Sequence, residues 1–235
     1  FVHCYMPNAG YNEVREKVAN HLNLHNQSSY AMEDIIMTVG AAGGLNCVFR
    51  SLLEESDEVL CFAPYFGEYR SYVANYGGNL TVVPADFETF QLNVKELRQY
   101  LSPRTKAVIL NNPNNPSGVI YKKEVLAELQ EILAEAEREY GHPIYVVSDE
   151  PYRDLVYDDN ELPFAPAYIK NCIVVYSFSK SLSLSGERIG YMAVSKQIDY
   201  YDILIHALVV ANRCIGYINA PSLFQLVAAD CLEVK

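Results

Sequence analysis

Short apolar runs of strand length recur along the sequence and alternate with segments whose apolar residues have helical spacing. Runs this apolar predict strands that are buried on both faces, as in a sheet covered by helices. The predicted strands are Ile35–Val39, Glu58–Phe62, Leu80–Val83, Lys106–Leu110, Ile144–Ser148, Ile173–Phe178 and Tyr191–Val194. The predicted helices before and between them are Tyr11–Leu24, Gly44–Glu54, Glu68–Tyr76, Asn93–Leu101 and Lys122–Tyr140.

This alternation predicts an α/β fold, with a mostly parallel sheet sandwiched between helices. The character of the sequence changes after Val194, where residues 197–211 and 221–233 both predict helices with no strand between them. Because sheets of this kind place ligands at the carboxyl ends of their strands, we expect the chemistry in the loops that follow the strands.

Composition and charge exclude several classes of function. Acidic residues outnumber basic ones by 29 to 18, giving a formal net charge of −11. With no Lys/Arg-rich run to offset that charge, we expect neither a nucleic-acid partner nor a membrane surface. Six scattered cysteines without a CxxC pair predict buried, reduced thiols and a cytoplasmic protein. His21 and His25 have a spacing that can bind metal, but no third ligand is near, so we expect a polar helix face and no metal.

A lysine follows the predicted strand at 173–178. Lys180 stands between two serines, and we expect it to be partly desolvated at a strand end, which would lower its pKa and favour a Schiff base with a carbonyl. A lone lysine is more often exposed, so the prediction depends on its neighbours. Ser177, Ser179 and Arg188 offer hydroxyls and a guanidinium suited to a phosphate.

Three further loops carry candidate groups. Asp149 follows a buried strand and needs either an arginine or a protonated ligand nitrogen as its partner; structural ion pairing is an equally good reading of this residue alone. Asn115 lies in a turn-forming run, 111–118, from which its amide can reach a ligand. Small residues at 40–44 precede a predicted helix, and their backbone amides can close on a phosphate, although this run lacks the GxGxxG and Walker patterns.

Together these groups describe a site for pyridoxal 5′-phosphate. Their order and spacing resemble the fold-type I aminotransferases of the class I/II group. The resemblance rests on the lysine motif Ser177–Tyr191, the asparagine motif Asn111–Gly118 and the acid motif Ser148–Tyr152, and it runs from Tyr5 to about Pro221.

The resemblance implies a role for each matching residue. Lys180 would form the Schiff base and move the substrate proton, and Asp149 would keep the ring nitrogen protonated. Tyr152 and Asn115 would hydrogen-bond the phenolic oxygen. An aromatic ring that stacks on the cofactor is implied at Phe66, where an ordinary core aromatic is an equally good reading. The phosphate contacts are implied for the amides of Ala41 and Ala42 and for Ser177, Ser179 and Arg188.

The resemblance also implies a homodimer, because Tyr5 matches a family tyrosine that reaches the phosphate of the neighbouring subunit. Residues 1–235 then correspond to the large, cofactor-binding domain, and the family's N-terminal segment and C-terminal small domain, with its carboxylate-binding arginine, are expected outside this sequence. The implied reaction is amino-group transfer between an amino acid, possibly aspartate, and a 2-oxo acid. A carbon–sulfur β-lyase of the same fold and a non-catalytic pyridoxal-phosphate sensor fused to a DNA-binding domain stay open as alternatives.

Overall fold

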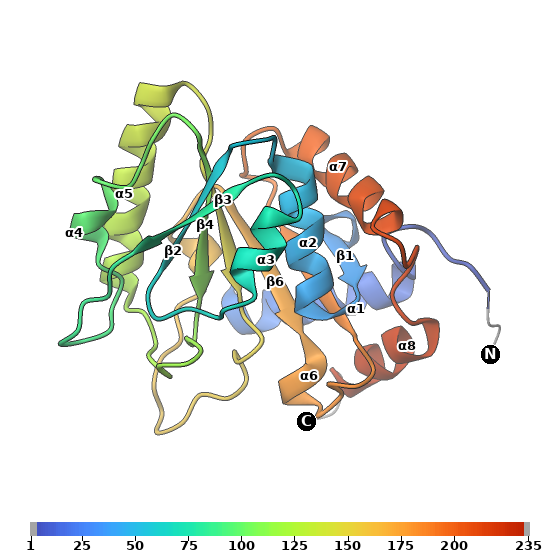
Figure 1. The fold of residues 1–235 in the computed structure, drawn as a ribbon. Helices are drawn as coiled ribbons and strands as arrows, with labels where there is room; N and C mark the ends of the chain where they lie inside the picture. Colours follow the sequence, from blue (N-terminus) through green and yellow to red (C-terminus); the bar gives the residue numbers. More distant parts are fainter. Residues whose placement is uncertain (1–3, 233–235) are drawn as a thin grey trace. The chain divides into compact units, whose positions relative to one another are not determined.

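The computed structural model describes residues 4–232 and divides the chain into two compact units. Unit 1 comprises Phe1–Ser51 and Val174–Lys235, and unit 2 comprises Leu52–Ile173. Figure 1 shows the ribbon coloured along the chain, and each unit is described separately below.

Unit 2 contains four strands that all pair in parallel. Their order is β5-β4-β2-β3, and in register Asn111 at the end of β4 stands beside Asp149 at the end of β5. The two end residues therefore share the carboxyl edge of the sheet, where ligands bind in this kind of fold. The strands are β2 (Glu58–Phe62), β3 (Asn79–Val83), β4 (Thr105–Asn111) and β5 (Tyr145–Asp149).

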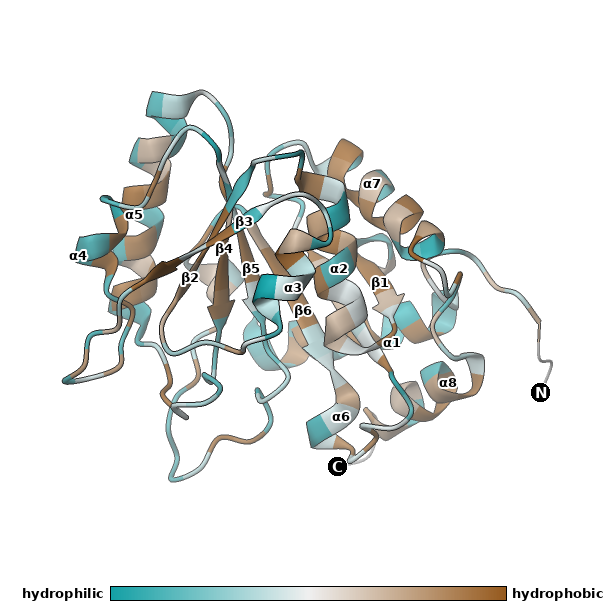
Figure 2. Ribbon diagram, viewed as in Figure 1, coloured by the Kyte–Doolittle hydropathy of each residue, from teal (hydrophilic) through white to brown (hydrophobic). Residues whose placement is uncertain are grey.

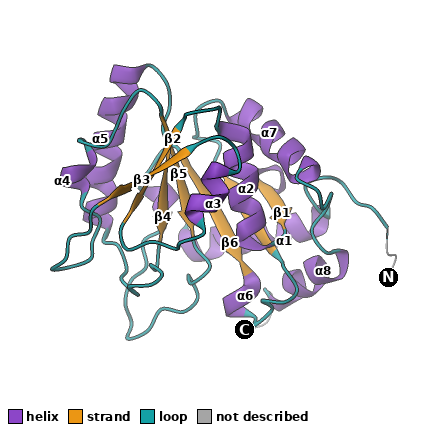
Figure 3. Ribbon diagram, in the orientation of Figure 1, coloured by secondary structure: helices purple, strands orange, loops and turns teal. Residues whose placement is uncertain are grey.

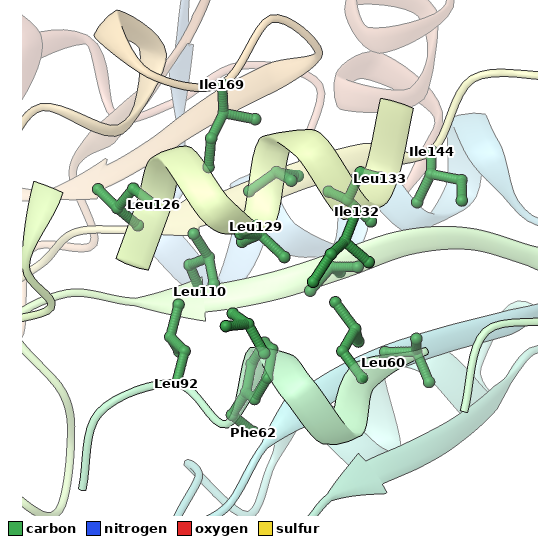
Figure 4. Packing of buried hydrophobic residues seen from close by; sticks show 14 of the residues in the cluster. Leu60, Phe62, Leu92, Leu110, Leu126, Leu129, Ile132, Leu133, Ile144 and Ile169 are labelled. Carbon is green, nitrogen blue, oxygen red and sulfur yellow. The ribbon is translucent and has the colours of Figure 1, made fainter. Parts of the chain in front are cut away.

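One face of these strands packs against two helices. Leu126, Leu129 and Leu133 of α5 (Lys123–Tyr140) lie over strand residues that include Leu60 and Leu110, as Figure 4 shows. The short helix α4 (Val94–Leu97) adds Val94 and Leu97 to the same cluster. The apolar stripe of α5 faces these residues while its charged residues face outward, so the helix carries both colours in Figure 2.

The opposite face of β5 carries a residue of the candidate site. Val146 belongs to the cluster under α5, and because successive side chains of a strand alternate, Asp149 points away from that cluster. Helix α3 (Tyr69–Ala74) meets it there, since the Tyr69 hydroxyl bonds the Asp149 carboxylate. The pleat thus separates the hydrophobic packing from the candidate site.

In its described residues, unit 1 contains three strands, the first part of one of them shared with unit 2, and the remaining long helices. The antiparallel pair β1 and β7 lies beside β6, and the chain enters unit 1 within β6. Figure 3 shows the one-turn helix α6 directly after β6. The elements are α1 (Asn12–Asn26), β1 (Ile35–Thr38), α2 (Gly40–Leu52), β6 (Cys172–Ser177), α6 (Phe178–Ser181), β7 (Gly190–Val194), α7 (Tyr201–Cys214) and α8 (Ser222–Cys231).

The predicted α/β class is confirmed, with strands that pair mostly in parallel, and several element boundaries need correction. Helix α2 begins at Gly40 and not at Gly44, because small residues let its first turn pack close to Arg188 at Gly40 and its second turn pack close to Val175 at Gly44. The helix predicted at 93–101 is reduced to Val94–Leu97, and the remainder forms turns. In the predicted helix 221–233, Glu233 lies outside the described residues. Within residues 4–232 no helix has the length and apolarity to cross a membrane.

Candidate active site

The predicted site residues divide between the two units, and each unit holds a coherent group. Unit 2 contains Asp149, Tyr152, Asn115 and Phe66, which are the residues predicted to contact the cofactor ring. Unit 1 contains the lysine and the residues predicted to contact the phosphate: Lys180, Ala41, Ala42, Ser177, Ser179 and Arg188.

Asp149 is buried with one carboxylate oxygen unsatisfied. The residue is 5% exposed, and its Oδ2 accepts a hydrogen bond of 2.6 Å from the Tyr69 hydroxyl. For Oδ1, also buried, the described part of the chain supplies no hydrogen-bond partner. A buried acceptor in this state is costly unless a ligand completes it. A donor such as a protonated ring nitrogen would complete it.

The surroundings of Asp149 change its protonation. Burial raises the pKa of its carboxyl from 3.8 to about 7; the Tyr69 hydrogen bond opposes that rise and the charge of Glu150 adds to it. The nearby Arg153 donates from Nε to Glu150 at 2.6 Å, and the carboxylate of Asp149 accepts from Tyr69 and from no arginine of the described residues. Of the two partners predicted for Asp149, the protein arginine is therefore absent within the described unit, and the ligand nitrogen remains.

The Glu150 side chain anchors the segment that carries Tyr152. Glu150 is buried and accepts from the Ser148 hydroxyl at 2.7 Å as well as from Arg153. Tyr152 lies between these anchored residues and is half-buried. Its pKa is raised by burial and, second, by the charge of Asp149, so its hydroxyl stays protonated near neutral pH.

Asn111, which the sequence analysis did not select, joins the two loops. Its side-chain Nδ2 donates to the backbone carbonyl of Asp149 at 2.9 Å, and its Oδ1 accepts from the backbone amide of Asn115 at 2.6 Å. One side chain thus fixes the strand end that carries Asp149 and the loop that carries Asn115. Tyr69 was also missed; it donates to Asp149 and meets Phe66 edge to face at 5.6 Å between ring centroids.

In unit 1 the guanidinium of Arg188 lies against the start of α2. A Cβ placed on Gly40 would stand 2.7 Å from Arg188 Nη2, and Arg188 Nη1 donates to the Ser179 hydroxyl at 3.4 Å. Nearby, Gly190 approaches the Gly40 backbone so closely that its own Cβ would lie 3.0 Å from it. The first-turn amides of α2, including those of Ala41 and Ala42, point from the same helix end.

This arrangement fits an anion. A cation such as the Arg188 guanidinium at the positive end of a helix dipole is unfavourable by itself. An anion between the guanidinium and the N-terminal end of α2 would be attracted by both groups. Ser177 and Ser179 complete the group: Ser177 caps α6 by accepting from the Ser179 amide at 3.2 Å, and the two hydroxyls are 2.7 Å apart. Backbone amides, hydroxyls and a guanidinium are the donors that bind phosphate groups.

The desolvation predicted for Lys180 is wrong for the described chain. Its side chain is exposed, because β6 ends at Ser177 and Lys180 is the third residue of α6, beyond the buried strand. Tyr5 is also exposed, at 82%, and the role predicted for it belongs to a neighbouring subunit.

Comparison with known proteins identifies the family. The sequence profile described as "Aminotransferase class I and II" matches residues 2–233. The chain belongs to this family. The class I and II aminotransferases depend on pyridoxal phosphate, as the sequence motifs predicted.

Individual relatives agree with the assignment. The chain is 35% identical over 198 residues to the probable aspartate/prephenate aminotransferase of Aquifex aeolicus, and the match covers 82% of this chain and 49% of that protein. It is 33% identical over 213 residues to the aspartate aminotransferase of Pyrococcus horikoshii, covering 88% of this chain and 52% of that one. The chain therefore spans about half the length of the curated relatives it matches.

Solved structures give the same result. An amino transferase from Eubacterium rectale superposes with a TM-score of 0.97 at 40% identity, covering 99% of this chain and 59% of that chain. A tetra mutant of Thermus thermophilus aspartate aminotransferase has a TM-score of 0.87 at 31% identity, covering 98% of this chain and 60% of that chain.

Proposed function

We propose that residues 1–235 are the cofactor-binding domain of an aminotransferase that moves an amino group between an amino acid and a 2-oxo acid. The observation that carries the proposal is Asp149, a buried carboxyl with one oxygen satisfied by Tyr69 and the other unpartnered. The matched family and the names of the relatives support the reaction type.

Each unit, taken by itself, offers groups suited to one polar end of pyridoxal phosphate. Asp149 Oδ1 would accept from the ring nitrogen, and Tyr152 and Asn115 would hydrogen-bond the phenolic oxygen, with Phe66 stacked on the ring. The phosphate would be held by the amides of Ala41 and Ala42 and by Ser177, Ser179 and Arg188. When bound, the cofactor supplies an aldehyde that condenses with amines and a ring that accepts electrons from the substrate α-carbon.

The protein's own residues then have distinct tasks. Lys180, exposed on α6, would provide the amine that holds the aldehyde carbon and would carry the proton removed from the substrate α-carbon. The ionised Asp149 would keep the ring nitrogen protonated, which is what makes the ring an electron acceptor. Tyr152 would donate a hydrogen bond from its hydroxyl to the phenolic oxygen of the cofactor and so orient the ring.

The substrate and the assembly belong to the proposal as well. Aspartate is the first substrate to test, because several relatives are named aspartate aminotransferases. We propose a homodimer in which Tyr5 reaches the partner's phosphate site, supported by the exposure of Tyr5. A cytoplasmic location is supported by the cysteines, all six of which are free thiols. The predicted burial holds for Cys47, Cys61 and Cys172 and is wrong for Cys4 and Cys214, which lie on exposed segments outside the strands, and for Cys231, which is partly exposed.

The assignment of Lys180 is tested by trapping. Borohydride reduction of the protein loaded with pyridoxal phosphate, followed by peptide mapping, should place the pyridoxyl group on Lys180. Lys180→Ala should lose the label while retaining reversible, phosphate-dependent binding. A label on another lysine would contradict the assignment.

The reaction type is tested with single substrates. Aspartate alone should yield about one oxaloacetate per site, and added 2-oxoglutarate should make the reaction continue. Release of pyruvate and ammonia from cysteine conjugates would favour the β-lyase. No product from any amino acid, with cofactor bound, would favour the sensor.

A further inference from the structure

Tyr69 is a buried residue that contacts two of the residues predicted to hold the cofactor ring. It begins α3 and is 1% exposed. Its hydroxyl donates to Asp149 Oδ2 at 2.6 Å, and its ring meets Phe66 at 5.6 Å with an interplanar angle of 77°. A single side chain therefore joins the acid and the stacking aromatic.

We propose that Tyr69 is a positioning residue for the cofactor ring: its hydroxyl engages one oxygen of Asp149 and leaves the other for the ring nitrogen, while its ring packs against Phe66 and fixes it. The proposal rests on the function proposed above. Without the Tyr69 bond the carboxyl would be free to rotate about its last torsion, and either oxygen could turn from the ring.

The bond also favours the charged carboxylate. Donation by Tyr69 opposes the upward shift that burial and Glu150 impose on the Asp149 pKa. Tyr69 itself stays a neutral donor, because burial and then the neighbouring Asp149 charge raise its pKa well above 10. The other titratable group known to face Asp149 is Tyr152, whose pKa is raised as well.

Two further titratable groups adjoin Tyr69 and provide a matched control. Cys61 and Tyr121 both raise the Tyr69 pKa. Tyr121 is buried, at 3% exposed, and its hydroxyl accepts from Asn114 at 3.0 Å. Tyr121→Phe therefore removes a buried, hydrogen-bonded hydroxyl of the same unit without removing a bond to Asp149.

Tyr69→Phe separates the two contacts, because it keeps the ring against Phe66 and deletes the hydroxyl. The Asp149 pKa can be measured by NMR in protein without cofactor, with the aspartates labelled by ¹³C at the side-chain carboxyl carbon. The signal of Asp149 is the one that disappears in Asp149→Asn. We expect the Asp149 pKa to be higher by about 1 or more in Tyr69→Phe than in the wild type. Tyr121→Phe should leave it unchanged. A Tyr69→Phe titration that overlays the wild type would overturn the proposal.

The second readout is the pH dependence of cofactor affinity. A pKa increase of about 1 lowers the ionised fraction of Asp149 by roughly tenfold near pH 6 and hardly at all near pH 9. Tyr69→Phe should therefore bind pyridoxal phosphate about tenfold more weakly near pH 6, with the loss vanishing near pH 9. A loss of equal size at both pH values would show that the hydroxyl acts through packing alone and would overturn the proposal.

The two proposals fail in different ways. If the wild-type protein shows no binding of pyridoxal phosphate, the proposed function is wrong, and the carboxyl titration still decides whether Tyr69 controls Asp149. If the wild type binds the cofactor and Tyr69→Phe behaves identically at every pH, the function stands and the role of Tyr69 falls.

Discussion

Asp149 should lower the stability of the cofactor-free protein, and Asp149→Asn should reveal it. The carboxyl has a pKa of about 7 in the folded chain against 3.8 as its ordinary value. Between those values the folded chain keeps a proton that the unfolded chain has lost, so a rise in pH favours unfolding. Stability is lost as pH rises from about 4 to about 7 and is constant above, with a full cost of about 4 kcal/mol.

The variant removes this dependence and keeps most of the local structure. The asparagine carbonyl can still accept from Tyr69, while its amide, in place of Oδ1, is left without an acceptor at a cost of about 1–3 kcal/mol. That cost does not change with pH. From the two pKa values, the wild type should lose about 2 kcal/mol relative to Asp149→Asn between about pH 5.5 and about pH 8.5.

Urea unfolding of both proteins at the two pH values measures this difference. Asp158→Asn, which removes a carboxylate from an exposed position of the same unit, gives the effect of the lost charge alone. A difference between wild type and Asp149→Asn that stays constant within about 0.5 kcal/mol across the range would refute the reasoning, because a carboxyl that ionises normally makes no such contribution.

Three other changes test the phosphate site and the core. Gly190→Ala places a Cβ 2.2 Å from the Tyr176 carbonyl oxygen and should destabilise the protein by about 1–3 kcal/mol in thermal unfolding. Gly186→Ala, whose Cβ would have no atom within 4 Å, should leave the stability unchanged. Equal effects of the two changes would argue against the close approach at Gly190. Arg188→Ala should weaken pyridoxal-phosphate binding by about 10- to 100-fold in a fluorescence titration. Arg98→Ala, at an exposed position, serves as the control. Unchanged binding in Arg188→Ala would remove Arg188 from the site. Leu129→Ala, in the buried cluster under α5, should lower the free energy of unfolding measured in urea by about 2–5 kcal/mol. The control Leu24→Ala, at an exposed position, should lower it by less than about 0.5 kcal/mol. A small loss for Leu129→Ala would mean that the cluster collapses around the gap.

The strands and the strand-end residues were predictable because both depend on local sequence. An apolar run such as 106–110 can be buried in few ways, and a polar residue directly after it must lie at the sheet edge. This is why Asp149 was selected and was found at the end of β5. The helix ends were less well predicted, since α2 begins within a glycine-rich run whose propensity favours a loop and whose packing favours a helix.

The residues that orient the site could not be found from local sequence. Tyr69 is 80 positions from Asp149, and Asn111 is 38 positions from it. Tyr69 belongs to an ordinary amphipathic segment, and Asn111 is one of several asparagines in a turn-forming run. What distinguishes both is the strand order and the pleat, which bring α3 and the end of β4 to the same face as Asp149.

Lys180 and Asp149 differ in how strongly the folded chain points to a function for them. An exposed lysine after a strand costs the fold little, so its position alone is compatible with any surface role. A buried carboxyl with an unpartnered oxygen costs about 4 kcal/mol above pH 7, whereas an asparagine with an unpartnered amide would cost about 1–3 kcal/mol. Packing therefore cannot account for an acid at position 149. A protonated nitrogen against Oδ1, as proposed above, would account for it, because such a partner would offset the cost of burial and would itself be held in its charged form.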